Sequence, residues 1–202
     1  FVKKGKQFFC VRRFQSELDL ITDNWFNDIV KNGDNMGVDI SFKAGIFYFN
    51  DEIAGYAVPL SRSQYYKSTS FPNVDLIIFD EFIIDTSNAH YLRNEVKQLL
   101  DLYETVARTR EGVKAFLLAN SLSFVNPYTL YWGLTMPKHK NICKAVDGLV
   151  LCELVQDSEF TDFKKQTSFG KLIAGTDYER FSVQNEFILD NDTFIQKKTF
   201  GS

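Results

Sequence analysis

Residues 76–81 of this 202-residue chain read LIIFDE, four apolar residues followed directly by two carboxylates. Four consecutive apolar residues are typical of a strand that is buried on both faces, as in a parallel sheet covered by helices. In open α/β sheets, ligands bind beyond the carboxyl ends of such strands. The stretch therefore predicts an α/β fold in which Asp80 and Glu81 lie at a ligand-binding edge of the sheet.

Two neighbouring carboxylates can divide the work of a phosphate-hydrolysing site. One holds a hydrated Mg²⁺ and the other polarises a water. On this interpretation Asp80 lies at the metal and Glu81 activates the attacking water. This is the Walker B pattern of nucleotide hydrolases, although the companion phosphate loop, GxxxxGK[ST], is absent from the 202 residues. The plain alternative is that both acids face solvent or cap a helix.

Composition narrows the function classes. The chain is 45% hydrophobic and contains 20 phenylalanines, which is enough apolar material for a packed core and argues against disorder. A net charge of -3 argues against a generally basic nucleic-acid coat. Cys10 and Cys152 lie in apolar runs, and three cysteines with two histidines do not favour a zinc site. No apolar run reaches the length of a membrane span.

Hydrophobic periodicity predicts a strand–helix–strand unit around the acidic pair. Buried strands are expected at 74–79 and 113–118, with a helix over 92–106 between them. Asp85 and Ser87 offer helix caps before this helix. A unit of this kind is right-handed and its two strands are parallel.

The remaining pattern completes an α/β fold with a mostly parallel sheet flanked by helices. We expect a strand at 7–11, an amphipathic segment over 18–29, an antiparallel hairpin annex within 38–59 that turns at 50–51, a polar loop at 61–70, a helix opening at 126–127 and a further core strand at 149–155.

Five further polar residues are candidates for the same site. Asn120 follows the strand at 113–118, so a parallel crossover brings it to the edge that carries the acidic pair. Arg12 and Arg13 end the first strand, where two planar donors can meet phosphate oxygens. Arg108 ends the long helix and Lys67 lies in the polar loop. Each has an ordinary alternative: a turn cap for Asn120, a helix-dipole partner for Arg108 and a solvated surface cation for the others.

Taken in order, the segments of this chain resemble the DNA-packaging (encapsidation) ATPases of small podophages that prime replication with a terminal protein and use a packaging RNA. The resemblance extends over nearly the whole chain. It is carried by the stretches at residues 7–13 (QFFCVRR), 54–61 (AGYAVPLS), 71–74 (FPNV), 79–82 (FDEF), 94–96 (NEV), 106–111 (VARTRE), 123–128 (SFVNPY) and 169–176 (FGKLIAGT).

This resemblance implies a P-loop NTPase-like fold of the class with an additional catalytic glutamate. It also implies ATP and Mg²⁺ as cofactors, with Asp80 as the Walker B acid at the metal and Glu81 as the catalytic base. Arg108 corresponds to a trans-acting arginine finger and Lys67 to a second trans-acting cation. Asn120 fits the sensor position after the neighbouring strand.

The resemblance further implies a homo-pentameric ring that drives double-stranded DNA into a procapsid. The implied partners are the DNA, the portal (connector), the packaging RNA and other copies of the same subunit, with no membrane. The implied location is the host cytoplasm, transiently at the portal vertex of the procapsid.

The chain departs from the family pattern in its missing phosphate loop. In the family that loop lies on a strand and helix shortly before the point that corresponds to Phe1, and a nuclease-like domain follows the linker at the other end. We therefore expect a truncated ATPase core at 1–157 and a helical or irregular subdomain at 158–202 that leads to the linker. Two alternatives stay open: a non-catalytic nucleic-acid-binding or scaffold module, and a helicase-type ATPase.

Overall fold

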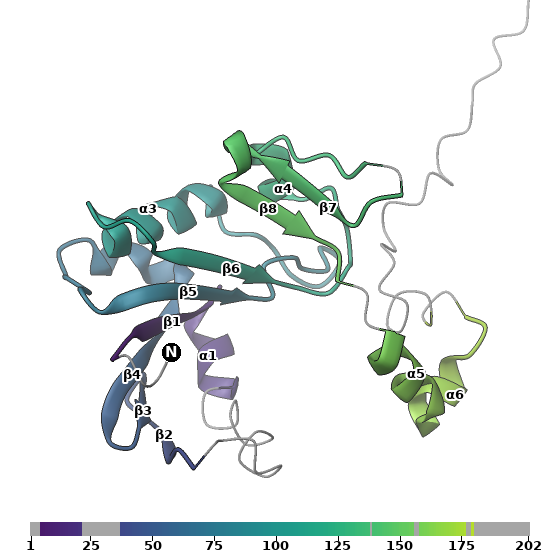
Figure 1. Cartoon of the computed structure of the whole chain (residues 1–202), viewed down its shortest axis with the longest axis horizontal. Coiled ribbons are helices and arrows are strands. Elements are labelled where there is room, and N and C mark those ends of the chain that lie inside the picture. Colours follow the sequence, from purple (N-terminus) through teal and green to yellow (C-terminus); the bar gives the residue numbers. More distant parts are fainter. Residues whose placement is uncertain (1–4, 22–36, 138, 156–157, 177–178, 180–202) are drawn as a thin grey trace, which may run out of the picture. The chain divides into compact units, whose positions relative to one another are not determined.

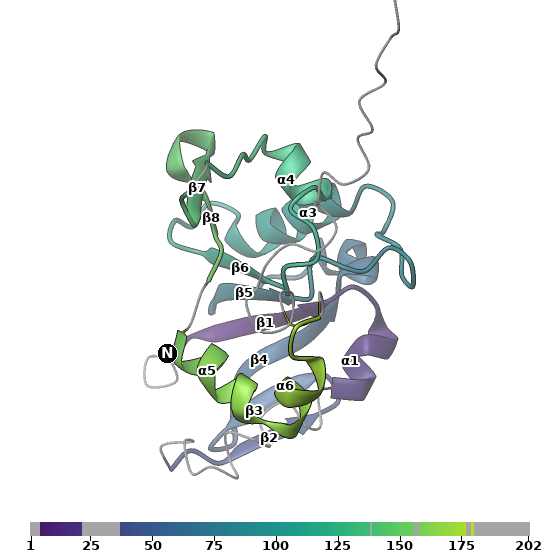
Figure 2. The same ribbon diagram turned by 90° about the vertical axis from the view of Figure 1, so that its right-hand side faces the viewer.

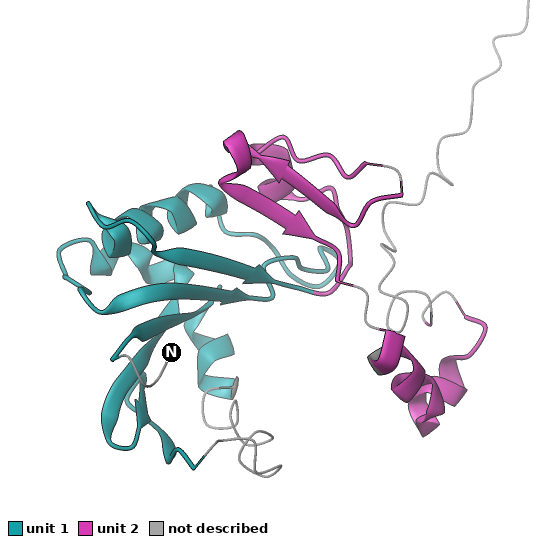
Figure 3. Cartoon of the chain, viewed as in Figure 1, with its two compact units in different colours: residues 1–119 teal, residues 120–202 magenta. Residues whose placement is uncertain are grey.

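A computed structural model describes residues 5–21, 37–137, 139–155, 158–176 and 179. The chain divides into two compact units, residues 1–119 and residues 120–202 (Figure 3). The predicted boundary at 157 therefore differs from the division that the structure makes. Among the described residues, no helix is both long and apolar enough to cross a membrane.

The first unit is built on one six-stranded sheet (Figure 1). Its strands are β1 (Gln7–Arg12), β2 (Ile40–Lys43), β3 (Ile46–Phe49), β4 (Glu52–Pro59), β5 (Val74–Asp80) and β6 (Lys114–Leu118), in the spatial order β2-β3-β4-β1-β5-β6. Figure 2 shows the same order from the side. The pairs β4/β1, β1/β5 and β5/β6 are parallel, whereas β2/β3 and β3/β4 are antiparallel. The predicted α/β fold is confirmed, and the hairpin annex is a continuation of the same sheet.

The antiparallel part turns where the sequence predicts it. Asn50 and Asp51 join β3 to β4, and both have positive φ values, 50° and 65°. Asparagine and aspartate tolerate this left-handed conformation better than most residues because their short side chains bond locally. The Asn50 side chain accepts a hydrogen bond from the backbone nitrogen of Asp39 at 2.8 Å, which ties the turn to the start of β2.

Alternating side chains of β1 cover the two faces of the sheet. Phe8 and Cys10 lie on the face that is covered by Leu18 of α1 (Gln15–Ile21). Phe9 projects to the opposite face, where its ring packs edge-on against Phe71, with ring centroids 4.7 Å apart. The amphipathic segment predicted over 18–29 is helical up to residue 21, and the rest of it lies outside the described residues.

The Phe9 face is covered by η2 (Leu60–Tyr66) and α3 (Glu95–Ala107), which pack against each other. Val96, Leu99 and Val106 of α3 are buried, as the three- and four-residue spacing predicts, and Leu102 is buried as well. The prediction of a polar loop at 61–70 is wrong for residues 61–66, because these residues belong to the 3₁₀ helix η2. Leu60 and Ser63 of that helix are buried, so tertiary packing overrides the polar composition of the segment.

The predicted caps of the long helix are also wrong. The Asp85 carboxylate accepts hydrogen bonds from the nitrogen and hydroxyl of Ser87 in a local turn, at 2.9 and 2.7 Å, and α3 begins at Glu95. Its N-cap, Asn94, has a left-handed backbone and no side-chain capping bond. Asp85 therefore stabilises a local turn, which aspartate side chains do as commonly as they cap helices.

The second unit contains α4 (Pro127–Tyr131), a two-stranded ribbon of β7 (Ile142–Ala145) and β8 (Val150–Glu153), and the helices α5 (Ser158–Gln166) and α6 (Ser168–Ile173). Asn126 caps α4 reciprocally with Thr129 and precedes Pro127, which confirms the predicted helix start. Helix α6 begins at its cap Thr167, whose hydroxyl accepts a hydrogen bond from the Gly170 nitrogen at 3.0 Å.

The strand predicted at 149–155 is confirmed as β8, but its predicted place in the core is wrong. Strand β8 pairs only with β7 among the described residues, in an antiparallel ribbon closed by the short 3₁₀ helix η3 (Val146–Gly148). Leu149 is 86% exposed and Leu151 is 57% exposed. A short apolar run fits either a buried strand or an exposed ribbon, and periodicity alone does not separate them.

Substitution of Gly55 tests the close packing of β4 against β1. A Cβ at this position would lie 2.5 Å from the carbonyl oxygen of Phe8, its register partner. We expect Gly55→Ala to lower the free energy of unfolding by about 1–3 kcal/mol because the strands must separate locally. Urea denaturation measures the change. Ser41→Ala, at an exposed position of β2, is the control, and equal midpoints for the two variants would contradict the packing.

Candidate active site at the carboxyl edge of the sheet

Asp80 is the last residue of β5, and Glu81 follows it outside the strand. Glu81 has a φ of 58°, in the left-handed region that non-glycine residues seldom adopt. The Asp80 carboxylate accepts a hydrogen bond from the Glu81 backbone nitrogen at 3.1 Å, which supports this turn. Non-glycine residues in this conformation concentrate at functional sites, where the surrounding structure holds them in place.

Arg12 joins both carboxylates from the neighbouring strand. Its Nη2 lies 2.6 Å from Oδ2 of Asp80, and its Nη1 lies 2.5 Å from Oε2 of Glu81. Parallel pairing of β1 with β5 makes this contact possible, because Val11 is the register partner of Phe79 and both strands end at the same edge. The guanidinium thereby offsets the repulsion between the two acids.

The two acids differ in their exposure. The Asp80 side chain is 28% exposed and the Glu81 side chain is 61% exposed. Asp80 is held by Arg12 and by the backbone, whereas the Glu81 carboxylate reaches further into solvent. This difference in exposure is compatible with the predicted roles, in which Asp80 binds a cation and Glu81 activates a water.

Arg13 is buried beneath the same turn. Its guanidinium binds both carboxylate oxygens of Glu95, at 2.7 and 2.9 Å, and both side chains are at most 2% exposed. It also donates to the carbonyl oxygens of Glu81 and Phe82, at 3.3 and 3.1 Å. The centroid of the Phe79 ring lies 5.5 Å from the guanidinium carbon. Arg13 therefore supports the turn from inside, and the prediction that it contacts phosphate stays untested.

Glu95 is the functional neighbour that sequence reasoning missed. In the sequence it is one acid in the first turn of a helix, where an exposed helix-dipole role is the usual interpretation. In the structure its carboxylate turns inward to Arg13 and also accepts a hydrogen bond from the Leu92 nitrogen at 2.7 Å. Its position directly after Asn94 and three residues after Leu92 gives no sign of this partner.

Lys67 and Arg108 form a second group around α3. The Lys67 ammonium lies 3.1 Å from Oδ2 of Asp101 on α3, and this hydrogen bond lowers the pKa of Asp101 below its usual value. Arg108 directly follows α3 and donates from Nη2 to the Thr69 carbonyl oxygen at 3.0 Å. Both cations are exposed, and both are attached to the segment that leads into β5.

Arg108 lies at the end of β5 opposite the acidic pair. Arg110, two residues further on, donates to the carbonyl oxygens of Phe71 and Val74 at the start of β5, at 3.0 and 2.8 Å. A seven-residue strand spans about 20 Å. In this conformation Arg108 therefore does not reach Asp80 or Glu81 of its own chain.

Asn120 belongs to the second unit. The strand before it does end at the predicted edge, because Leu118 of β6 is the register partner of Asp80 and accepts a hydrogen bond from the Phe82 nitrogen at 3.1 Å. Contact between Asn120 and the acidic pair stays a prediction.

The part of the chain that the structure describes offers a limited set of metal ligands. It contains no group of three or more His, Cys, Asp or Glu side chains that could enclose an ion. A single carboxylate such as Asp80 nevertheless fits Mg²⁺, which is commonly held by one or two carboxylates together with waters and phosphate oxygens. The donor set thus suits a cation that arrives with a nucleotide.

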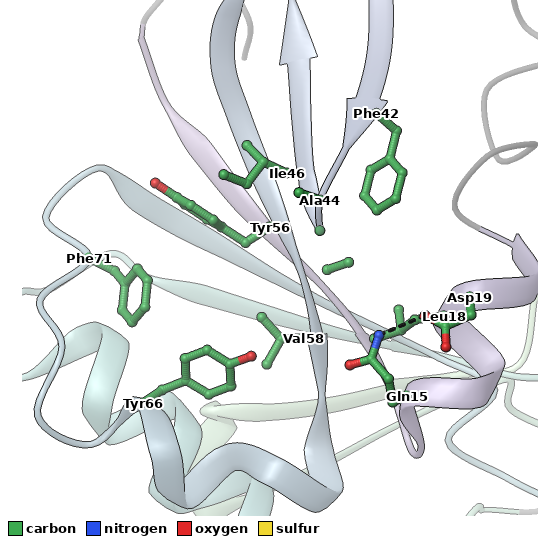
Figure 4. A pocket seen from close by; sticks show the side chains of 12 residues that line it. Gln15, Leu18, Asp19, Phe42, Ala44, Ile46, Tyr56, Val58, Tyr66 and Phe71 are labelled. Atoms are coloured by element: carbon green, nitrogen blue, oxygen red, sulfur yellow. Dashed lines mark hydrogen bonds between the residues drawn. The ribbon is translucent and has the colours of Figure 1, made fainter.

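A cavity of about 600 Å³ lies away from the acidic pair (Figure 4). It is bordered by α1, the β2–β3 turn, the second half of β4 and the aromatic rings of Tyr66 and Phe71. Within it Gln15 donates a hydrogen bond to Asp19 at 2.8 Å. Neither Asp80 nor Glu81 lines this cavity, so it is not part of the candidate site.

The protein is thus a mixed α/β protein in which Arg12 bridges two carboxylates, Asp80 and Glu81, at the carboxyl end of the parallel strand β5. The model of the Podovirus DNA encapsidation protein (Gp16) family matches residues 1–202, and the chain belongs to this family. It is 41% identical over 204 residues to the DNA packaging protein of Bacillus phage B103, covering 100% of this chain and 61% of that protein.

Two solved structures show the same fold. The N-terminal domain of the DNA packaging ATPase from bacteriophage phi29 is 39% identical, with a TM-score of 0.69 over 79% of this chain and 80% of that one. A chain of the bacteriophage phi29 viral genome packaging motor assembly is 40% identical, with a TM-score of 0.74 over 100% of this chain and 60% of that one. The chain thus spans about three fifths of the length of the B103 protein and of the motor-assembly chain.

Removing the charge of Glu95 tests its role beneath the site. We expect Glu95→Gln to lower the free energy of unfolding by about 3 kcal/mol, because it leaves Arg13 as a buried charge without its counterion. Glu104→Gln, at an exposed position on the same helix, is the matched control. Chemical denaturation of both variants measures the difference, and equal stability would contradict a structural role for the ion pair.

Proposed function

We propose that the whole protein to which this chain belongs is an ATP-driven motor subunit that moves double-stranded viral DNA into a preformed procapsid. The observation that carries the proposal is the Asp80–Glu81 pair at the carboxyl end of β5, in a chain that belongs to the DNA encapsidation family. The similar phi29 protein is described as a packaging ATPase, which supports the assignment of ATP as the fuel.

In this proposal each acid has one task. Asp80 binds the Mg²⁺ of Mg-ATP, and this ion supplies charge neutralisation at the phosphate oxygens. Glu81 orients the attacking water and accepts its proton. Glu81 has a left-handed backbone directly after the strand, and Arg12 forms ion pairs with both acids in this structure.

The phosphate cradle comes from outside this chain. The 202 residues contain no GxxxxGK[ST] pattern, so we propose that a segment preceding Phe1 in the whole protein supplies the phosphate loop of a P-loop NTPase-like fold with an additional catalytic glutamate. Arg12 lies at the same edge, and in this proposal it releases the two acids and binds a phosphate oxygen when Mg-ATP binds. Asn120, which follows β6, is in this proposal the sensor residue that contacts the γ-phosphate or the attacking water.

Arg108 and Lys67 act on the nucleotide of a neighbouring subunit in a homo-pentameric ring. The support is geometric, because Arg108 lies at the far end of β5 from its own acidic pair and is exposed. In this proposal Arg108 therefore acts on the site of the neighbouring subunit and not on its own. The remaining partners in the proposal are the portal and the packaging RNA, and the location is the host cytoplasm at the portal vertex.

The missing phosphate loop favours one other candidate function, a non-catalytic nucleic-acid-binding module. In that case the acids are surface groups paired with Arg12, and the full-length protein binds DNA without hydrolysing ATP.

A helicase-type ATPase uses the same chemistry but requires no procapsid. Packaging of DNA into purified procapsids separates it from the motor.

The role of Glu81 is tested in the full-length protein. We expect Glu81→Gln to lower kcat for ATP by at least about 10²-fold while the Kd for ATP changes little, because the amide cannot accept the proton of the water. Steady-state hydrolysis and nucleotide titration measure the two effects. Glu104→Gln on α3 is the control, and unchanged turnover in Glu81→Gln would exclude the assigned role.

The trans role of Arg108 is tested by mixing subunits. Rings made only of Arg108→Ala or only of Glu81→Gln should be inactive, whereas mixed rings should recover part of the ATPase rate. Recovery is expected because some interfaces then pair an intact Glu81 with an intact Arg108. Titration of one variant against the other measures it. A complete lack of recovery at every ratio would indicate that Arg108 acts within its own subunit or only in folding.

A further inference from the structure

Two cysteines face each other across the β7–β8 ribbon of the second unit. Cys143 and Cys152 are register partners in the antiparallel pair, so their side chains project from the same face of the ribbon. Directly opposed residues in antiparallel strands have Cα atoms about 4.5–5.5 Å apart. This separation lies within the range that a disulfide bridges, about 4.4–6.8 Å.

The two thiols are close and unequal in exposure. Both cysteines are free, and Cys143 lies close enough to Cys152 to raise its pKa. Cys143 is 7% exposed, whereas Cys152 is half-buried and is the one that solvent reaches more easily. The third cysteine, Cys10, is fully buried in β1 of the first unit.

We propose that Cys143 and Cys152 form a dithiol modification site that is oxidised by low-molecular-weight disulfides to a cross-strand disulfide. The Cys152 thiolate attacks one sulfur of the small disulfide and releases one small thiol, which leaves a mixed disulfide on Cys152. The Cys143 thiolate then attacks the Cys152 sulfur and releases the second small thiol. Two protein thiols lose two electrons and two protons, and the small disulfide gains both.

The surroundings of Cys152 slow its reaction with small disulfides near neutral pH. Burial, and then the proximity of Cys143, raise the pKa of Cys152 to about 11. Because only the thiolate is a nucleophile, the thiol reacts slowly near neutral pH. Once the mixed disulfide forms on Cys152, Cys143 lies opposite it on the neighbouring strand. Its attack on the Cys152 sulfur is therefore intramolecular and is favoured over attack by a small thiol from solution.

Closure of the bond would fix an exposed part of the unit. The ribbon is a separate two-stranded sheet among the described residues, and isolated hairpins are only marginally stable. The turn between its strands places Val146, Asp147 and Gly148 at positive φ, with Val146 as a strained β-branched residue. A disulfide between Cys143 and Cys152 closes the loop around this turn.

Lys144 gives a direct readout, because it lies inside the loop that the disulfide closes. Full-length protein is incubated with oxidised glutathione, the free thiols are then blocked, and the sample is unfolded and digested with trypsin. We expect peptides 141–144 and 145–164 to be recovered as one disulfide-linked species that separates on reduction.

Cys143→Ser is the matched control. It should yield a glutathione adduct on Cys152 or an unmodified Cys152, and no species that links peptides 141–144 and 145–164. Recovery of peptide 141–144 as a free, blocked thiol in the wild type after prolonged oxidation would overturn the proposal. Linkage of Cys152 to another subunit or to Cys10 would overturn it as well.

Discussion

The buried ion pair between Arg13 and Glu95 holds the candidate site together. It joins the end of β1 to the start of α3, and the same guanidinium binds two carbonyl oxygens of the turn that follows β5. Three elements thus meet at one side chain that is almost completely removed from water. A charge buried in this way is tolerated only when its partners are in place, so the turn that carries Glu81 is fixed by the fold.

Arg12 and Arg13 show how two adjacent residues of the same type acquire different roles. Arg12 is the last residue of β1 and extends its guanidinium to the two carboxylates at the edge of the sheet. Arg13 follows the strand and points into the interior. One arginine therefore balances the charge of the acids, and the other secures the backbone on which they stand.

The predicted site residues separate into two groups because a parallel sheet has two different ends. The acidic pair lies at the carboxyl end of β5, whereas the helix that follows runs back and delivers Arg108 to the amino end. A strand–helix–strand crossover always imposes this separation on residues that end the strand and residues that end the helix. The acidic pair and Arg108 of one chain therefore lie at opposite ends of the sheet.

The sequence by itself determined the positions of β1, β5 and β6 and the buried face of α3, since apolar runs and a strong 3.6-residue period are local signals. The prediction that the strand at 113–118 is buried is wrong, because β6 is at the edge of the sheet and Phe116 is 53% exposed. It also placed Asp80 and Glu81 at the end of β5. Only the tertiary structure decided that Glu95 is buried against Arg13, that α3 starts at residue 95 and that β8 joins β7 in place of the main sheet. Each of those outcomes depends on a residue or strand that is distant in the sequence. The residues next to Glu95 or β8 in the sequence do not indicate which distant partner will pack against them.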